Sequence, residues 1–259
     1  MAQNFGGGLR SLPPVTKNLI IINALIWLVE VIWPQFGVNG IIRHLGLHYV
    51  EATYFNPAQI ITYMFVHDQG TFFHVFFNML TLFFFGPWLE RMWSSKRFFI
   101  FYMICGLGAG IVQECVMAIQ WHHQFKDYIQ WFASNNHMTL SEAAEEVRRL
   151  ISAGHPEMLA QINMMKNSMV CIGASGAIFG VLLGFAFVFP NMPINLYFLI
   201  PIKAKYLVAG YAVIEFFCGI TGSVGNVAHF AHLGGLLFAL PILLYWKHKG
   251  KLHGGNYFY

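Results

Sequence analysis

Four polar residues that lie in apolar surroundings could together perform nucleophilic catalysis. Ser175 lies in the run Gly-Ala-Ser-Gly at 173–176, and His232 lies in a later apolar run. A serine hydroxyl is a poor nucleophile until a base removes its proton, and a neutral imidazole is the usual base near pH 7. His74 and Asn78 are spaced i,i+4 and therefore share one helix face. Their side chains and the Ser175 backbone N–H are candidate donors to the oxyanion that such an attack creates.

Two neighbouring histidines compete for roles at this site. His229 precedes His232 by one helical turn, but only His232 is followed by glycine three residues later, at Gly235. We therefore favour His232 as the base. His67, seven residues before His74 at the junction of the loop and the span, is predicted to be structural and to hydrogen-bond the first outer loop. No acid is evident as a third member, because the acids within apolar runs have no obvious place at this site: Glu30, Glu114 and Glu215.

The elements that must position these residues are predicted to be membrane spans. Of the 259 residues, 57% are hydrophobic and 10% are charged, whereas soluble domains carry about 25% charged residues. We expect an all-α membrane protein built as a six-helix bundle, although several segments are shorter than the roughly 20 residues of a full span. The predicted spans are about Asn18–Trp33, Thr71–Leu89, Phe98–Ile119, Val170–Phe189, Tyr206–Gly219 and Val227–Trp246.

Three of the predicted spans bring the polar residues to one depth. The second, fourth and sixth spans run in the same direction, and each carries its polar residue within one or two turns of the outer end. Helices in a membrane approach closely where small residues lie at their contact. Small residues recur every fourth position below both Ser175 and His232, namely Gly176, Gly180 and Gly184 in one span and Gly235 and Ala239 in the other.

The positions of lysine and arginine predict the topology. Basic residues near span ends are retained on the cytoplasmic side. With the N-terminus inside, 10 of the 15 Lys and Arg residues lie on the inner side. We expect a cytoplasmic segment at 1–17, a membrane domain at 18–246 and a cytoplasmic tail at 247–259. The N-terminal segment resembles neither a cleaved signal nor a transit peptide, which favours a bacterial cell membrane.

Two long outer segments are predicted. Pro34–Gly70 mixes apolar and charged residues, which suits a structure partly sunk in the membrane interface. The second is an insert at 120–169, between the third and fourth spans, and it is the most polar part of the chain. Thr139 and Glu142 have the spacing of a capping box ahead of a helix-forming run through Ile151.

Three motifs resemble the rhomboid family of intramembrane serine proteases. They are Gly173-Ala174-Ser175-Gly176, Ala231-His232-x-x-Gly235 and His74-x-x-x-Asn78, and the resemblance spans roughly residues 15–247. It implies a dyad with Ser175 as nucleophile and His232 as general base. It also implies an oxyanion site formed by His74, Asn78 and the Ser175 amide. In this family the substrate is a transmembrane helix of a membrane protein, cut near its outer end.

The sequence departs from the family pattern at three places. Family members often carry Trp-Arg in the first outer loop, whereas this chain has Ala58-Gln59. The aromatic residue four positions after the serine is often Tyr, and here it is Phe179, which keeps the stacking surface but lacks the hydroxyl. The insert at 120–169 is longer than expected, and its role is unassigned.

Two other function classes remain to be weighed. A catalytically silent rhomboid-like protein that binds membrane helices is the main alternative, although such proteins usually lack the serine or the base. A transporter or channel would place polar residues at mid-membrane, whereas these lie toward one face. The Gly-rich stretch Gly219–Gly225 is typical of a turn, but over a buried site it could also be a mobile cap.

Metal, cofactor and nucleic-acid sites are not predicted. The cysteines show no CxxC spacing and the insert histidines no HExxH pattern. The basic residues are scattered and form no nucleic-acid footprint. The expected partners are transmembrane-protein substrates and the lipid bilayer. The cysteines without CxxC spacing are Cys105, Cys115, Cys171 and Cys218, and the insert histidines without an HExxH pattern are His122, His123, His137 and His155.

Overall fold

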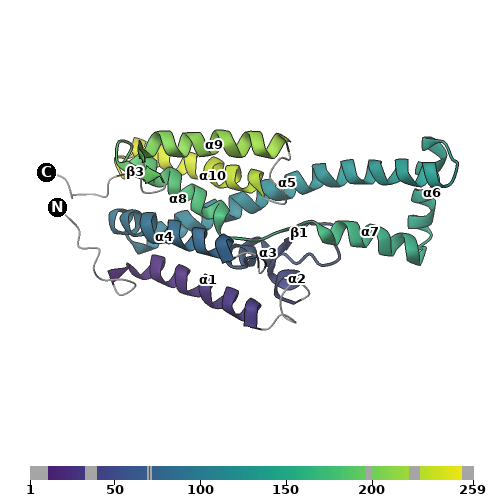
Figure 1. Cartoon of the computed structure of the whole chain (residues 1–259), viewed down its shortest axis with the longest axis horizontal. Helices are drawn as coiled ribbons and strands as arrows, with labels where there is room; N and C mark the ends of the chain where they lie inside the picture. The colour runs from purple at the N-terminus through teal and green to yellow at the C-terminus, as the bar shows by residue number, and fades with distance from the viewer. Residues whose placement is uncertain are drawn as a thin grey trace.

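Apolar helices packed side by side form one part of the molecule, and a long helical arm projects from one end of them (Figure 1). This computed structural model describes residues 11–32, 40–68, 70, 72–196, 200–221 and 228–252. We call the apolar helices the membrane bundle, with residues 95–119 as the part that α5 contributes. They are α1 (Pro14–Ile32), α4 (Phe72–Trp93), α5 (Ser95–Asn135), α8 (Ser175–Val188), α9 (Ala204–Thr221) and α10 (His229–His248).

The composition of these helices confirms an all-α, multi-pass membrane protein. Five helices of the bundle are long and apolar enough to cross a membrane, and α8 is a shorter apolar helix. The count of six spans and the cytoplasmic location of the termini stay predictions. Parts of the predicted N-terminal segment, of the predicted cap and of the tail lie outside the described residues, at 1–10, 222–227 and 253–259.

Helix α8 occupies the centre of the bundle, where it contacts α4, α5, α9 and α10. Ten of its 14 residues are buried. At 1.5 Å per residue it is about 21 Å long, less than the roughly 30 Å of a hydrocarbon core. The surrounding helices shield the non-helical chain that precedes it, which irregular backbone at membrane depth requires.

The prediction that the fourth span is helical from Val170 is wrong. Val170–Cys171 forms strand β2, and the helix begins only at Ser175. Strand β2 pairs antiparallel with β1 (Leu47–His48). The apolar run reports burial, and a short buried strand and a buried helix give the same apolar signal.

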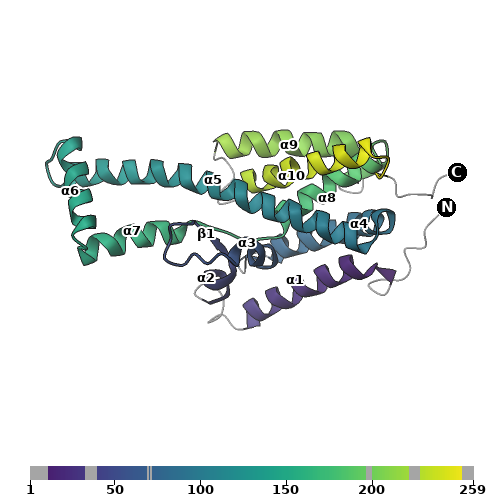
Figure 2. The same ribbon diagram turned by 180° about the vertical axis from the view of Figure 1, so that it is seen from behind.

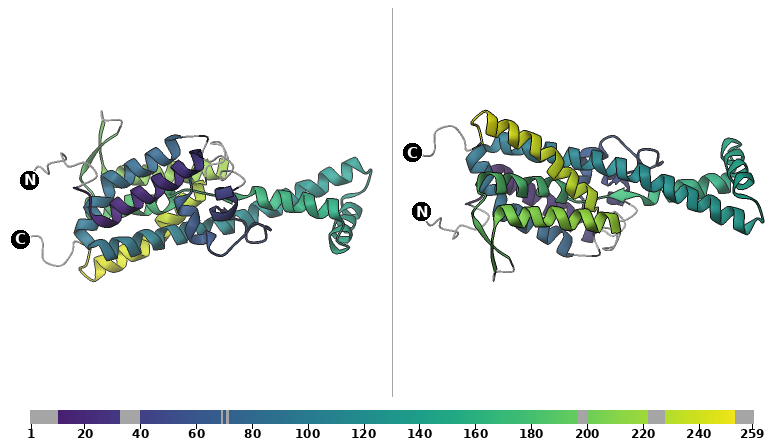
Figure 3. Two further views of the ribbon diagram at one scale, coloured as in Figure 1. Left: turned by 90° about the horizontal axis from the view of Figure 1, so that it is seen from below. Right: turned by 90° about the horizontal axis from the view of Figure 1, so that it is seen from above.

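Glu90 joins three helices at the end of the bundle opposite the arm. Its carboxylate, almost fully buried, accepts hydrogen bonds from the Val15 N–H at 2.9 Å and the Thr16 N–H at 2.7 Å in the first turn of α1. It also accepts one from Ser95 Oγ of α5 at 2.6 Å. An acid at a helix N-terminus satisfies free N–H groups and the positive end of the helix dipole. This contact holds α1 against α4, and α1 lies along α4 (Figure 3).

The segment between α1 and α4 is organised around Gln59. It contains α2 (Ile42–Leu45), β1, α3 (Gln59–Thr62) and the 3-10 helix η4 (Tyr63–Phe65). The buried Gln59 side chain donates to Tyr54 O at 2.8 Å and to His44 O at 3.2 Å, and it accepts from the Asn56 N–H at 3.2 Å. Gln59, which with Ala58 stands where family members often carry Trp-Arg, therefore anchors this loop itself.

The described ends of the chain meet the same part of the bundle. Arg91 donates to Ser11 O at 2.9 Å, ahead of α1. Trp93 Nε1 donates to Leu252 O at 2.8 Å, after α10. Both donors belong to α4 near its junction with α5. The hairpin β3 (Pro193–Leu196) and β4 (Ile200–Lys203) connects α8 to α9 at this end.

The helical arm, residues 120–168, comprises the rest of α5 with α6 (Leu140–Ser152) and α7 (Pro156–Ser168) (Figure 2). The third span was predicted to end near Ile119, but α5 continues without a break to Asn135. The capping box at the start of α6 is confirmed, since the Thr139 hydroxyl and the Glu142 carboxylate each bond the other's backbone N–H. A small apolar cluster lies between the three helices, with Val147, Met158 and Ile162 at its centre.

Candidate active site

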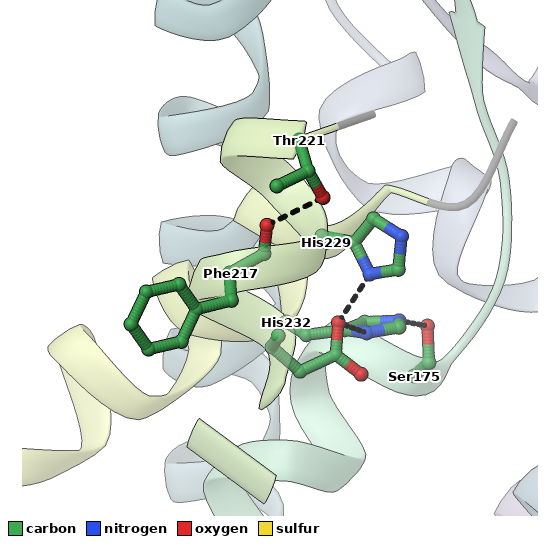
Figure 4. A network of polar contacts seen from close by, with 6 residues as sticks. Ser175, Phe217, Thr221, His229 and His232 are labelled. Atoms are coloured by element: carbon green, nitrogen blue, oxygen red, sulfur yellow. Dashed lines mark hydrogen bonds and ion pairs between the residues drawn. The ribbon is translucent and has the colours of Figure 1, made fainter. Parts of the chain in front are cut away.

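Ser175 and His232 form a hydrogen-bonded pair at the end of the bundle that carries the arm. Ser175 is the first residue of α8, and His232 lies in the first turn of α10. The Ser175 Oγ to His232 Nε2 distance is 2.7 Å (Figure 4). A hydroxyl within this distance of a ring nitrogen can pass its proton to it. The sequence argument from depth brought these two residues together, and the structure places them in contact.

The chain that delivers Ser175 depends on Gly173. Its φ of 116° lies in the region that favours glycine, and its N–H donates to Tyr63 O at 2.9 Å. The Tyr63 hydroxyl in turn donates to Gly106 O of α5 at 2.7 Å. A Cβ at position 173 would lie 2.8 Å from His74 Nε2. Gly173 is therefore required both by the turn and by the close approach of His74.

Glycines bring α8 and α10 into direct backbone contact beside the pair. A Cβ at Gly235 would overlap the carbonyl group of Gly176. A Cβ at Gly180 would lie 3.3 Å from Gly235 O. The close approach predicted from the small-residue spacing is thus present at these positions. Gly184, the third glycine of that stripe, instead faces Trp93 of α4 and Phe101 of α5.

Phe179 lies flat against the imidazole of His232. The ring centroids are 4.4 Å apart and the planes differ by 6°. One helical turn separates Phe179 from Ser175 on α8, so the same helix supplies both the hydroxyl and the stacking surface. The stacking restricts the ring plane of His232. The Phe179 ring carries no hydroxyl that could hydrogen-bond the histidine.

His74 and Asn78 lie on α4. Both His74 Nε2 and Ser175 Oγ lie within 4 Å of the point that a Cβ of Gly173 would occupy. Asn78, one turn further along α4, donates from Nδ2 to His67 Nε2 at 3.1 Å. The amide is therefore held in place, and its second N–H remains a candidate donor.

His67 contacts two residues of α4, which the sequence analysis did not predict. Its ring is fully buried and contacts the His74 ring edge-on, with centroids 5.1 Å apart. Burial lowers the pKa of His67 to about 3, so its Nε2 is free to accept the hydrogen bond from Asn78. The side chain therefore links the segment 34–70 to α4.

Glu215 also reaches the site, contrary to the sequence analysis, which left it outside. Its Oε2 lies 3.0 Å from His232 Nδ1 and 2.6 Å from His229 Nδ1. The signal that could have found it is depth, because Glu215 lies less than two turns from the end of α9 at Thr221. The convergence argument used the second, fourth and sixth spans and omitted the fifth.

The same three residues are the group whose atoms could hold a metal ion within the described ranges. The ligand atoms of Glu215, His229 and His232 lie within 4.8 Å of one another. In the structure His229 Nδ1 bonds Glu215 Oε2 and His232 Nε2 bonds Ser175 Oγ, while Glu215 Oε2 lies 3.0 Å from His232 Nδ1. Of the insert histidines, His122 and His123 are neighbours on α5 with ring centroids 6.0 Å apart.

Comparison with known families assigns most of the chain. Residues 55–248 match the family model described as the Rhomboid domain. A search of curated proteins finds no match.

Proposed function

The chain belongs to the rhomboid family, and on that premise we propose that it is an intramembrane serine endopeptidase. The observation that carries the proposal is the 2.7 Å contact between Ser175 Oγ and His232 Nε2. The proposed substrates are membrane proteins, cut at a peptide bond in or near the outer end of a transmembrane helix.

The proposed reaction has two halves. Ser175 Oγ attacks the scissile carbonyl carbon while His232 Nε2 takes the hydroxyl proton, and the carbonyl oxygen becomes an oxyanion. In the proposed mechanism the Ser175 N–H at the start of α8, His74 and Asn78 donate to that oxygen. His232 then gives its proton to the leaving amine, so the peptide bond breaks and an acyl-serine remains. Water, deprotonated by His232, hydrolyses this ester and restores Ser175.

The arrangement of the bundle supports a site near one membrane face. Ser175 begins α8 and His232 lies in the first turn of α10, both at the end from which the arm projects (Figure 1). The described chain ends contact α4 at the opposite end of the bundle. With six spans, this arrangement supports two cytoplasmic termini and an outward-facing site that water can reach. The proposed location is a bacterial cell membrane, which rests on the N-terminal sequence alone.

A cleavage assay with the protein in lipid vesicles tests the proposal. Unsubstituted protein should cleave members of a panel of single-span helical substrates and should react with a fluorophosphonate at Ser175. Ser175→Ala should abolish both signals, and Ser168→Ala in the arm is the matched control that should retain both. Unchanged cleavage by Ser175→Ala would contradict the proposal. Binding of the panel without turnover by unsubstituted protein would favour the silent helix binder.

A further inference from the structure

Glu215 of α9 has geometry that no dyad requires. Its Oε2 lies 3.0 Å from Nδ1 of His232, while Nε2 of the same ring lies 2.7 Å from Ser175 Oγ. The two nitrogens of one imidazole thus face an acid and a nucleophile. We propose that Glu215 is a positioning residue that completes a Ser175–His232–Glu215 triad, an inference that rests on the proposed protease function.

The tautomer of His232 is the first reason. A carboxylate is negatively charged and donates no hydrogen bond, so the ion-pair contact of Glu215 Oε2 at 3.0 Å favours the proton on Nδ1 of a neutral His232 ring. The lone pair is then on Nε2, where the Ser175 hydroxyl can donate to it. The other tautomer would carry a proton toward Ser175 and could not act as the base. Glu215 therefore selects the reactive form, which the stacking of Phe179 cannot do because a ring face does not distinguish the two nitrogens.

The charge that develops during the reaction is the second reason. When His232 takes the serine proton it becomes an imidazolium cation inside an apolar bundle, where an isolated charge is costly. A carboxylate in contact with Nδ1 offsets this cost in the transition state. In serine hydrolases the acid of a triad acts in this way, without itself becoming protonated.

His229 accounts for how Glu215 is held. Its Nδ1–H donates to the same Oε2 at 2.6 Å, and its ring is almost perpendicular to that of His232. Both histidines belong to the first turn of α10 (Figure 4), whereas Glu215 comes from α9. The carboxylate is thus placed by one histidine and directed at the other.

The other acids of the bundle have different tasks. Glu90 bonds the first turn of α1, and Glu114 accepts the Val50 N–H at 3.0 Å. A purely structural role for Glu215, as a tie between α9 and α10, would need only its bond to His229. The contact with His232 Nδ1 is what a structural tie does not explain.

The test compares Glu215→Gln with Glu215→Asp, and with Glu114→Gln as a matched control. Each variant is assayed in vesicles, and turnover is normalised to the amount of folded protein. For Glu215→Gln we expect kcat to fall about 100-fold or more with KM within about twofold, because a triad acid acts in the transition state. Glu215→Asp keeps the carboxylate and should recover a large part of kcat, and Glu114→Gln should stay near the unsubstituted rate.

A spectroscopic measurement separates orientation from folding. In protein labelled with ¹⁵N-histidine, the carboxylate 3.0 Å from His232 Nδ1 should shift the Nδ1–H proton of His232 downfield. It should move upfield in Glu215→Gln and stay in place in Glu114→Gln. The inference is overturned if turnover of folded Glu215→Gln stays within about threefold of the unsubstituted protein, or if the resonance does not move. Ser175→Ala serves in parallel, since an inactive Ser175→Ala beside a fully active Glu215→Gln would overturn the triad and leave the protease standing.

Discussion

The membrane bundle and the helical arm are held together in different ways within one chain. In the bundle, helices meet at glycines such as Gly176 and Gly235, and large apolar side chains face outward. In the arm, apolar side chains such as Val147 and Ile162 lie inside, and a capping box and the Glu146–Arg149 ion pair lie outside. Lipid is as apolar as a leucine side chain, so burying apolar groups adds little, and the bundle depends on close van der Waals packing between helices. Water makes burial itself favourable, so the arm depends on its small core.

The largest effect should come from adding one methyl group to the bundle. Gly235→Ala would drive a Cβ into the Gly176 carbonyl, where neither backbone can move without separating α8 from α10. We expect a loss of more than about 3 kcal/mol in folding free energy and loss of serine labelling, measured by thermal unfolding in detergent and by fluorophosphonate reaction. Gly210→Ala is the control, because a Cβ there meets nothing within 4 Å. Equal melting temperatures for the two variants would show that backbone contact does not hold the bundle.

A charge in the core of the arm should have an effect that is confined to the arm and therefore smaller in extent. Val147 is fully buried in the arm cluster, and Val147→Asp would place an unpaired carboxylate there, at a cost of several kcal/mol. We expect α6 and α7 to lose hydrogen-exchange protection while labelling of Ser175 stays within about twofold. Leu140→Asp, at an exposed position on the same helix, should leave protection unchanged. Loss of labelling in Val147→Asp would mean that the two regions fold as one unit.

The smallest effect should come from the capping box of the arm. Thr139→Ala removes the side chain that bonds the Glu142 N–H and should cost about 1 kcal/mol of α6 stability, seen as faster exchange in its first turn. Ser152→Ala, at the other end of α6, should not change exchange in the first turn of α6.

Acid probes the same contact. Hydrogen bonds from Thr139 lower the pKa of Glu142 below its ordinary 4.5, so the stabilisation is present above pH 4.5 and is lost as pH falls through the folded pKa. Protection from exchange in the first turn of α6, corrected for the intrinsic exchange rate at each pH, should therefore fall in acid in the unsubstituted protein and respond less in Thr139→Ala. An equal response in both would contradict the capping role.

The residues that share a local pattern were predictable from the sequence. The spacing of Thr139 and Glu142 is sufficient for a capping box, and the small residues around Gly176 and Gly235 are sufficient for a close helix contact. Ser175 and His232 could be paired because both lie near the outer end of a predicted span, so that one coordinate brings them together.

What could not be predicted depends on properties that hydropathy does not report. The end of the apolar run near Ile119 marks a change of solvent, but helix propensity continues to Asn135 and so does the helix. Glu215 looked like an isolated costly acid, because its partners His229 and His232 follow on the next helix. The sequence gives the depth of a side chain but not the direction in which its helix is rotated.

The unbroken course of α5 has a mechanical consequence. Its 41 residues make a stiff rod about 61 Å long, of which one end lies in the bundle and the other ends at the tip of the arm. Glycines at 106, 108 and 110 press this rod against Met64, Phe238 and Tyr63, and Tyr63 in turn holds the loop before Ser175. These contacts connect α5 to the backbone that carries Ser175. A sideways force on the tip of the arm would therefore act on that backbone.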